Sequence, residues 1–182
     1  MVFANAYKNV APSGYLKQAF ENAGFTNVIH IPNSIEIDKY EFKTRVELAP
    51  KLLWVRAFAS IYNPEMAVKV LQKKQEKHPS ASLTMVGPDK DGSLKTSKYF
   101  ADSIGVAVNF TGQLAKEDWW KLASEHDIFI NTTHFDNTPI SVMEAMALGL
   151  PVVSTNVGGI PYLLADKENA LLVSDNDVSK MT

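Results

Sequence analysis

Residues 136–159 read Asp-Asn-Thr-Pro-Ile-Ser-Val-Met-Glu-Ala-Met-Ala-Leu-Gly-Leu-Pro-Val-Val-Ser-Thr-Asn-Val-Gly-Gly, which predicts a loop, a helix and a strand in succession. Pro139 ends the loop, and the helix should stop at Gly149, because a proline two residues later prevents its continuation. The apolar residues up to Thr155 then predict a buried strand. The glycine pair at 158–159 should open a further helix, where the absence of side chains would let a ligand approach the backbone closely.

Two carboxylates, Asp136 and Glu144, lie eight positions apart in this stretch, one in the loop and one inside the helix. Between them lie the first backbone N–H groups of the helix, which lack intrahelical partners and attract anions. A ligand with hydroxyls at both ends and phosphate between them suits this arrangement, and a nucleotide-sugar fits that description. Plainer readings stay open: Glu144 as an acid that the helix dipole favours by about 0.3–1 kcal/mol, and Asp136 as a turn-forming residue.

Helix-like and strand-like patterns alternate along the whole chain. This alternation predicts an α/β fold, a Rossmann-like parallel sheet with helices on both faces. The expected helices cover about residues 15–22, 64–77, 94–103, 116–125, 139–148 and 160–165, and the first turn of another lies within 174–182. The expected strands cover residues 27–31, 52–58, 82–86, 107–110, 127–131, 151–155 and 171–173.

Composition excludes several classes of function. The chain has 182 residues, of which 46% are hydrophobic, enough for one well-packed domain. A net charge of −2 gives no broad electrostatic reason to bind nucleic acid, and no apolar run is long enough to span a membrane. The absence of cysteine excludes disulfides and thiol catalysis and is compatible with the cytoplasm. The four histidines show no metal-ligand spacing, so no metal is expected.

The stretch at 136–159 resembles the donor-binding segment of the group 1 (family 4) glycosyltransferases of the GT-B fold. Their pattern is Glu-x7-Glu followed by Ala-Met-Ala-x-Gly-x-Pro-Val-Val, and the run that begins at Glu144 matches it without a gap. The first acid of the pattern is Asp136 here, where the family has Glu. Aspartate has the same charge as glutamate and a shorter reach. Four further segments resemble the family in the right order: Ile31–Ile35, Leu83–Gly87, Val108–Gly112 and Asp127–Phe135.

The resemblance implies one half of a GT-B fold and assigns roles to both acids. Glu144 would accept hydrogen bonds from the ribose hydroxyls, because its two oxygens can take two vicinal hydroxyls. Asp136 would contact the hydroxyls of the transferred sugar, near the positive charge that develops at the anomeric carbon. The loop and helix start between them would face the sugar or the diphosphate with their backbone, although the proline has no N–H to offer: Asn137, Thr138, Pro139, Ile140 and Ser141.

A second group of candidates follows strand ends, the edge of an open α/β sheet where ligands bind. Gly87 and Gly112 each follow a strand, and a tight turn explains each of them equally well. By resemblance, the loop after Gly112 lies beside the nucleotide base, so Gln113 and Leu114 are candidates for base contacts. The neighbouring Trp119 and Trp120 sit in a helix pattern and are expected to pack in the core or at its edge.

Arg56 stands at the end of an otherwise apolar strand pattern, so its charge needs a partner. A carboxylate elsewhere in the fold would serve, and so would the diphosphate of the donor, which arginine can bind with two parallel hydrogen bonds. The sequence departs from the family here. The family's phosphate-binding Gly-Arg and Lys-Gly align with Arg56-Ala57 and Tyr62-Asn63. We interpret Arg56 as the replacement for the missing cationic pair, and Tyr62, at the position of the family's lysine, as a further candidate for donor contact.

The resemblance also implies how the chain is organised and what it does. Residues 1–30 are expected to be a linker-like segment from a missing N-terminal domain, and residues 31–182 a C-terminal nucleotide-sugar-binding domain, truncated at its end. The implied function is retaining transfer of a sugar from a nucleotide-diphosphate sugar to an acceptor hydroxyl, with Asp136, Glu144 and Arg56 as the catalytic group and no cofactor.

The expected partners are the nucleotide-sugar donor, the missing N-terminal domain, and an acceptor that is a glycan, a lipid or a small molecule. The expected setting is polysaccharide biosynthesis in the cytoplasm, with contact to the inner membrane face through the missing domain. Two alternatives stay open: a non-catalytic nucleotide-sugar-binding domain, and a nucleotide-sugar epimerase of the same fold.

Overall fold

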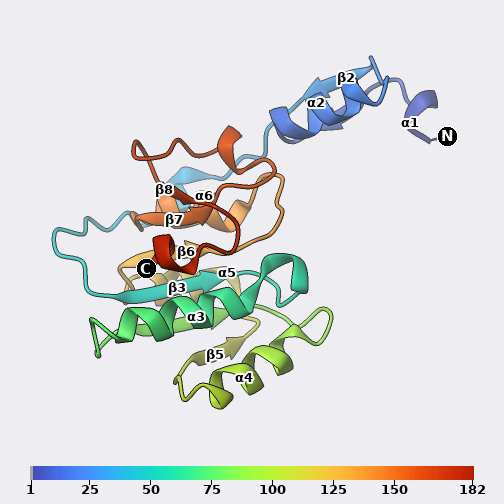
Figure 1. Cartoon of the computed structure of the whole chain (residues 1–182). Helices are drawn as coiled ribbons and strands as arrows, with labels where there is room; N and C mark the ends of the chain where they lie inside the picture. The colour runs from blue at the N-terminus through green and yellow to red at the C-terminus, as the bar shows by residue number, and fades with distance from the viewer. Residues whose placement is uncertain (1) are drawn as a thin grey trace.

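A six-stranded parallel sheet forms the centre of the computed structural model, which describes residues 2–182. The strands lie in the order β5-β4-β3-β6-β7-β8 (Figure 1). The chain builds outward from β3 in one direction and from β6 in the other, so the order reverses between these two strands. The bounds are β3 Lys51–Val55, β4 Ser82–Val86, β5 Asn109–Gly112, β6 Ile128–Asn131, β7 Val152–Thr155 and β8 Leu171–Val173.

Helices cover both faces of the sheet, as predicted. On one face lie α3 (Pro64–Gln75), α4 (Ser93–Ser103) and α7 (Val178–Met181), and on the other lie α5 (Lys116–Ala123) and α6 (Ile140–Ala147). Side chains alternate along β3: Leu52 and Trp54 pack toward α3, whereas Leu53 packs toward α6. Burial on both faces explains why the strands read as continuous apolar runs rather than alternating ones.

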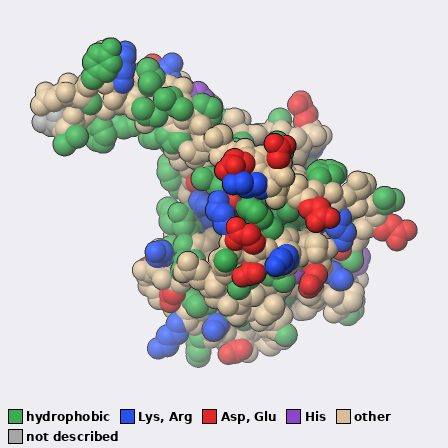
Figure 2. Space-filling model, turned by 180° about the vertical axis from the view of Figure 1, so that it is seen from behind, with side chains coloured by type: hydrophobic (Ala, Val, Ile, Leu, Met, Phe, Trp, Pro, Cys, Tyr) green, Lys and Arg blue, Asp and Glu red, His purple; other side chains and the backbone are tan. Residues whose placement is uncertain are grey.

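A small N-terminal unit, residues 9–30, projects from the main sheet (Figure 1). It follows α1 (Val2–Asn5) and consists of β1 (Asn9–Ala11), α2 (Gly14–Asn22) and β2 (Val28–His30), with the two strands parallel. Ser13 caps α2 by accepting a hydrogen bond from the Leu16 N–H at 3.0 Å. Hydrophobic side chains gather on the projection (Figure 2). Val10 of β1 and Ile29 of β2 are 53% and 36% exposed. The linker-like segment therefore has a fold of its own, while its origin in another domain stays a prediction.

The structure differs from the sequence prediction at a few ends of elements. The strand predicted over 52–58 ends at Val55, where the chain bends toward the 3-10 turn η2 (Ser60–Tyr62). The helix predicted over 160–165 is a single 3-10 turn, η3 (Ile160–Tyr162), whose N–H groups bond three residues back. The 3-10 turn η1 (Ile37–Lys39) was not predicted. Within residues 2–182, no helix combines the length and the apolar character that crossing a bilayer requires.

Candidate functional site

Six residues singled out from the sequence line one cavity of about 280 Å³. The cavity lies at the carboxyl ends of β3, β4 and β5, the edge where open parallel sheets bind ligands. Lys116 and Trp119 of α5 line it as well. The six predicted residues are Arg56, Tyr62, Gly87, Gln113, Leu114 and Ser141.

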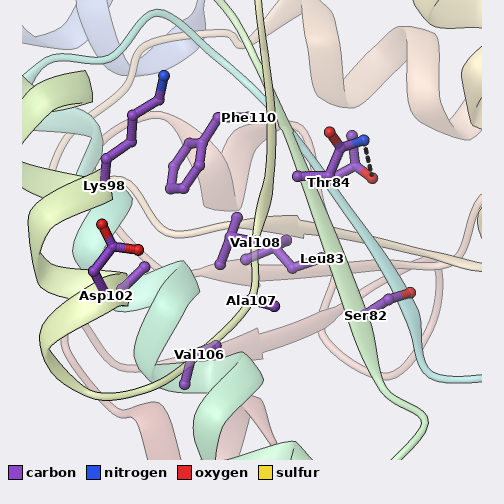
Figure 3. Close-up of a pocket in the computed structure, with 11 residues that line it drawn as sticks. Ser82, Leu83, Thr84, Lys98, Asp102, Val106, Ala107, Val108 and Phe110 are labelled. Atoms are coloured by element: carbon purple, nitrogen blue, oxygen red, sulfur yellow. Dashed lines mark hydrogen bonds between the residues drawn. The ribbon is translucent and has the colours of Figure 1, made fainter.

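A larger hollow of about 560 Å³ lies where β4 and β5 begin. Figure 3 shows Val106, Val108 and Phe110 in its wall, beside Lys98 and Asp102 from α4. Its lining is mostly apolar and it faces the amino ends of the strands. The smaller cavity is the better candidate, because it combines charged side chains with the carboxyl ends of the strands.

Gly87 brings the ends of neighbouring strands together beside the cavity. Its φ is 152°, and a Cβ atom here would lie 1.7 Å from the carbonyl oxygen of Arg56. Its N–H donates to the carbonyl oxygen of Gly112 at 2.8 Å. Both predicted glycines therefore shape the backbone of this edge, and Gly87 does so in a way that excludes any side chain.

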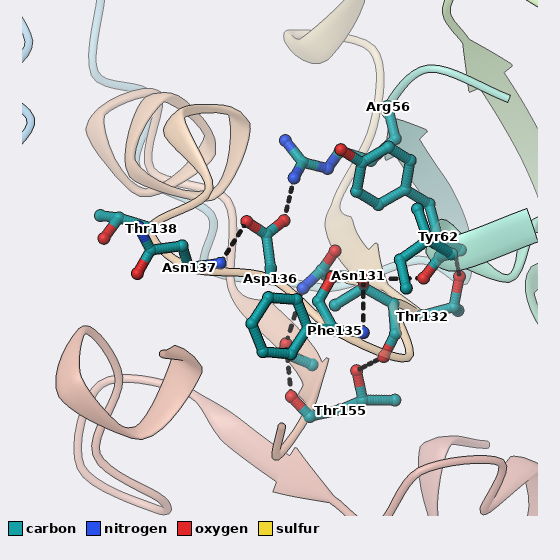
Figure 4. Close-up of polar contacts among 12 residues, drawn as sticks. Arg56, Tyr62, Asn131, Thr132, Phe135, Asp136, Asn137, Thr138 and Thr155 are labelled. Atoms are coloured by element: carbon teal, nitrogen blue, oxygen red, sulfur yellow. Dashed lines mark hydrogen bonds and ion pairs between the residues drawn. The ribbon is translucent and has the colours of Figure 1, made fainter. Parts of the chain in front are cut away.

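Arg56 lies between an aromatic ring and a carboxylate. Its guanidinium forms an ion pair with Asp136 and lies 4.3 Å from the centre of the Tyr62 ring, within cation–π range. Figure 4 shows these three side chains converging. Burial lowers the pKa of the guanidinium, and among the described residues its buried Nε has no hydrogen-bond partner. Because an unsatisfied buried donor is costly, this position suits an incoming acceptor.

The loop that carries Asp136 is held by the glycine pair at 158–159. The Asp136 carboxylate also accepts the N–H of Asn137 at 2.7 Å, and its carbonyl oxygen accepts the N–H of Gly159 at 2.8 Å. A Cβ atom on Gly159 would lie 1.9 Å from the carbonyl oxygen of Asn137. In the structure it is the acid loop that approaches the backbone of these glycines, while the approach of a ligand stays a prediction.

The N-terminal unit contacts the same loop from the other side. Ser13 donates a hydrogen bond to the Asn137 side chain, and the Thr138 hydroxyl donates to the carbonyl oxygen of Pro12 at 3.2 Å. The rings of Tyr15 and Phe135 pack edge to face with 5.7 Å between their centres. The side chains of Asn137 and Thr138 are therefore used to position the loop, and the Asn137 N–H is already donated to Asp136.

Glu144 lies in the second turn of α6 and is only 3% exposed. The Tyr40 hydroxyl and the Lys116 ammonium both donate to its Oε1, each at 2.9 Å. Burial, and then the hydrogen bond to Glu144, raises the pKa of Tyr40 to about 12, so its hydroxyl stays protonated at neutral pH. A buried glutamate with a tyrosine and a lysine on one oxygen is not explained by a helix dipole alone.

The first turn of α6 lies between the two acids, as predicted. Pro139 occupies the N-cap position, and the N–H groups of Ile140 and Ser141 belong to the turn that has no intrahelical acceptor. Within the described residues, the buried Ser141 Oγ has no hydrogen-bond partner, although Ser141 lines the cavity. Arg56 and Ser141, which both line the cavity, thus each have a buried polar atom that finds no partner among residues 2–182.

Sequence reasoning missed two residues, Tyr40 and Lys116. Tyr40 directly follows η1, a turn that the sequence did not predict, and it reaches Glu144 across 104 positions of the chain. Lys116 begins α5, just after the loop with Gln113 and Leu114. Its position next to this predicted site loop is the sequence feature that could have identified it. Trp119 is buried, as expected of a packing residue, but it also lines the cavity.

Comparison with known proteins decides the family. The sequence profile described as Glycosyl transferases group 1 matches residues 36–182. The chain belongs to this family. This group 1 glycosyltransferase chain is 29% identical over 106 residues to the sulfoquinovosyl transferase SQD2 of Arabidopsis thaliana, covering 57% of the chain and 20% of that protein. It is 25% identical over 163 residues to the D-inositol 3-phosphate glycosyltransferase of Mycobacterium marinum, covering 85% and 35%.

Solved structures support the fold of this group 1 glycosyltransferase chain. Anabaena HepE, solved in complex with UDP and glucose, superposes with a TM-score of 0.83 at 20% identity, covering 97% of the chain and 51% of HepE. TarM superposes with a TM-score of 0.84 at 15% identity, covering 99% of the chain and 36% of TarM. At such low identity these likenesses establish the fold alone. The chain spans about half or less of each of these relatives.

Proposed function

We propose that this chain is the donor-binding domain of a retaining glycosyltransferase, which moves a sugar from a nucleotide-diphosphate sugar to an acceptor hydroxyl. One observation carries the proposal. At the carboxyl ends of the strands, a cavity is lined by Arg56 and Ser141, whose buried Nε and Oγ have no partner among the described residues, and its two cations, Arg56 and Lys116, are paired with the buried acids Asp136 and Glu144. Anionic oxygens satisfy the first two atoms, and hydroxyl groups suit the acids.

Each residue has a role in this proposal. Arg56 and the N-terminal turn of α6 bind the diphosphate. Glu144 binds the ribose, and since Oε1 already accepts from Tyr40 and Lys116, Oε2 takes the main share. Asp136 binds hydroxyls of the transferred sugar while Arg56 stays close to it. Gln113 and Leu114 border the cavity where the base would lie.

In the proposed mechanism the chain positions the donor and stabilises charge, and it does not supply a nucleophile. In a front-face mechanism the leaving phosphate itself takes the proton of the acceptor hydroxyl. The protein then holds the donor and stabilises the charge that develops on the leaving diphosphate, and such preorganised groups act strongly where water is excluded. No metal or other cofactor enters this mechanism.

The comparisons support the donor class. HepE was solved with UDP and glucose and with UDP-glucose, so a fold of this kind holds a nucleotide-sugar. The named relatives of the chain include a sulfoquinovosyl transferase, an inositol phosphate glycosyltransferase and a glycogen synthase. We carry over the class of donor, and not any one sugar or acceptor.

A second domain would complete the cleft. Residues 1–30 lead from it in this proposal, and the exposed apolar face at Val10 and Ile29 suits further chain packed against the two-stranded sheet. That domain would bind the acceptor, a glycan, a lipid or a small molecule, in the cytoplasm or at the inner membrane face. Polysaccharide biosynthesis is the setting that we propose.

The rival function is a non-catalytic nucleotide-sugar-binding domain. The observation that favours it is the altered phosphate-binding segment, where Ala57, Tyr62 and Asn63 align with residues that include the family's cations. A sugar-transfer assay on the protein with its second domain separates the two functions. Transfer supports the enzyme, and donor binding without transfer supports the rival.

Calorimetry with UDP, GDP and ADP, each beside its nucleoside, tests donor binding by the chain directly. We expect one diphosphate to bind and to bind more tightly than its nucleoside, because the diphosphate adds the contacts to Arg56 and α6. If no diphosphate binds better than its nucleoside, the assignment of the cavity to a nucleotide-sugar is wrong.

A further inference from the structure

Lys116 is a cation of the candidate cavity that no sequence motif marked. It begins α5 and lines the cavity together with Arg56. Its Nζ lies 2.9 Å from Glu144 Oε1. The lysine side chain is 62% exposed, whereas that of the glutamate is 5% exposed. A flexible, solvated cation therefore lies over a buried acid.

The two cations of the cavity differ in how freely they can turn toward another anion. Arg56 is largely buried, stacked on Tyr62 and paired with Asp136. The Lys116 pair is open to solvent on the lysine side only, so its ammonium can reach water or another anion while Glu144 stays buried. The four-carbon stem of lysine lets the ammonium move to a new partner with little loss.

Tyr40 lets Glu144 keep its place when Lys116 moves. The Tyr40 hydroxyl donates to the same carboxylate oxygen at 2.9 Å, and its ring packs on Trp120 with 4.5 Å between the ring centres. Since this donor stays protonated at neutral pH, it continues to hold the carboxylate. The acid can thus give up the lysine and remain positioned.

We propose that Lys116 is a phosphate-binding residue: on donor binding its ammonium moves from Glu144 to the diphosphate, beside Arg56, while Tyr40 holds Glu144 for the ribose. This inference rests on the proposed function. It gives the site a second cation, at a position different from segment 56–63, where the family's pair is incomplete. If Lys116 only neutralises and orients Glu144, its loss would affect the nucleoside as much as the diphosphate, because both contain the ribose.

The test measures the affinity of a nucleoside diphosphate and of its nucleoside for the wild-type chain and two methionine variants, with UDP, GDP and ADP and their nucleosides as probes. Lys116→Met should weaken binding of the diphosphate roughly ten-fold, the loss of one charge-assisted hydrogen bond. It should change nucleoside binding by less than about two-fold. Lys121→Met, a control on the same helix, should change both affinities by less than about two-fold.

Thermal melting checks that the variants are folded. Lys116→Gln is a second variant without the charge, and its amide can still donate a hydrogen bond to Glu144. Equal losses for diphosphate and nucleoside would overturn the inference in favour of a role on Glu144 alone. Undiminished binding of both, or an equal effect of Lys121→Met, would overturn it too. If wild-type chain binds none of the diphosphates, it is the proposed function that fails, and the inference falls with it.

Discussion

At the scale of single residues, the site is built around two buried carboxylates. Asp136 and Glu144 are 9% and 3% exposed, and each has one cation as a partner. The sequence predicted both acids and Arg56, because a family motif surrounds the acids and an arginine at an apolar strand end needs a partner. It did not predict Tyr40 or Lys116, because their contacts to Glu144 depend on how distant segments pack.

Glu144→Gln should weaken the binding of a nucleoside diphosphate and of its nucleoside alike, by roughly ten-fold or more. The amide keeps the shape but loses a charged acceptor, and a charge-assisted hydrogen bond contributes about 1.5–3 kcal/mol. Calorimetry measures both ligands, and Glu117→Gln on α5 is the control for a lost acid. Unchanged affinities would mean that Glu144 does not bind the ribose.

Arg56→Ala should lower both stability and affinity. The variant leaves Asp136 buried without its cation, which should lower the free energy of unfolding by about 3 kcal/mol. The double variant Arg56→Ala with Asp136→Asn should lose less stability than the sum of the losses of the two single variants. On folded protein, Arg56→Ala should reduce diphosphate binding more than nucleoside binding. Equal binding losses for the two ligands would assign Arg56 to structure alone.

At the scale of elements, the acid loop lies between two supports, the glycine pair at 158–159 and the N-terminal unit. The alternation of helices and strands was predictable, since apolar strands and amphipathic helices have different periods. The role of the glycines was not, because their partner is the loop at 136–137, more than twenty residues earlier in the sequence. Strand ends and 3-10 turns were also missed, since they depend on local bends rather than on periodicity.

Gly159→Ala should displace the acid loop while the sheet stays folded. The φ of Gly159 is −84°, which alanine can adopt, so the effect comes from the added Cβ at 1.9 Å from the Asn137 carbonyl oxygen. We expect a loss of about 1–3 kcal/mol in stability and a weaker affinity for the diphosphate. Gly105→Ala is the contrasting variant: its φ of 68° strains an alanine, but its Cβ meets open space, so it should lower stability without weakening the affinity for the diphosphate. Wild-type affinity in Gly159→Ala would show that the loop does not need this support.

His126, just before β6, should make stability depend on pH. Its ring nitrogens lie 2.8 Å from the Leu122 carbonyl oxygen and 2.9 Å from the Thr84 hydroxyl, and burial lowers its pKa. The charged groups around it include Lys51, Glu125, Asp127 and Arg45, whose Nε donates to the His126 carbonyl oxygen at 2.9 Å. The unfolded chain then binds a proton more readily than the folded one, so stability should fall as the pH drops below the ordinary value of 6.5 toward the lowered pKa.

Denaturant unfolding at pH 7.5 and pH 5, on wild type and on His126→Gln, measures this contribution. The wild type should lose more stability than the variant over this interval, and each unit of pKa difference corresponds to about 1.4 kcal/mol. The same loss in both proteins would assign the pH dependence to other groups.

At the scale of the whole molecule, the carboxyl ends of three strands of the sheet border the candidate cavity. The α/β class and the family followed from the sequence, because motifs in five segments occur in the right order. The small fold of residues 9–30 did not follow, because its strands are only three residues long and its apolar face is exposed. A further cavity of about 590 Å³ lies between residues 39–45 and α5 and is also lined by cations. The presence of cations in a cavity therefore does not by itself identify the binding site of the donor.

A crystal structure of the chain with the nucleoside diphosphate that calorimetry selects tests the central claim most directly. We predict the diphosphate at Arg56 and the first turn of α6, the ribose on Glu144, and the base beside Gln113 and Leu114. A nucleotide bound instead between residues 39–45 and α5, with the ion pairs of Asp136 and Glu144 unchanged, would contradict the account.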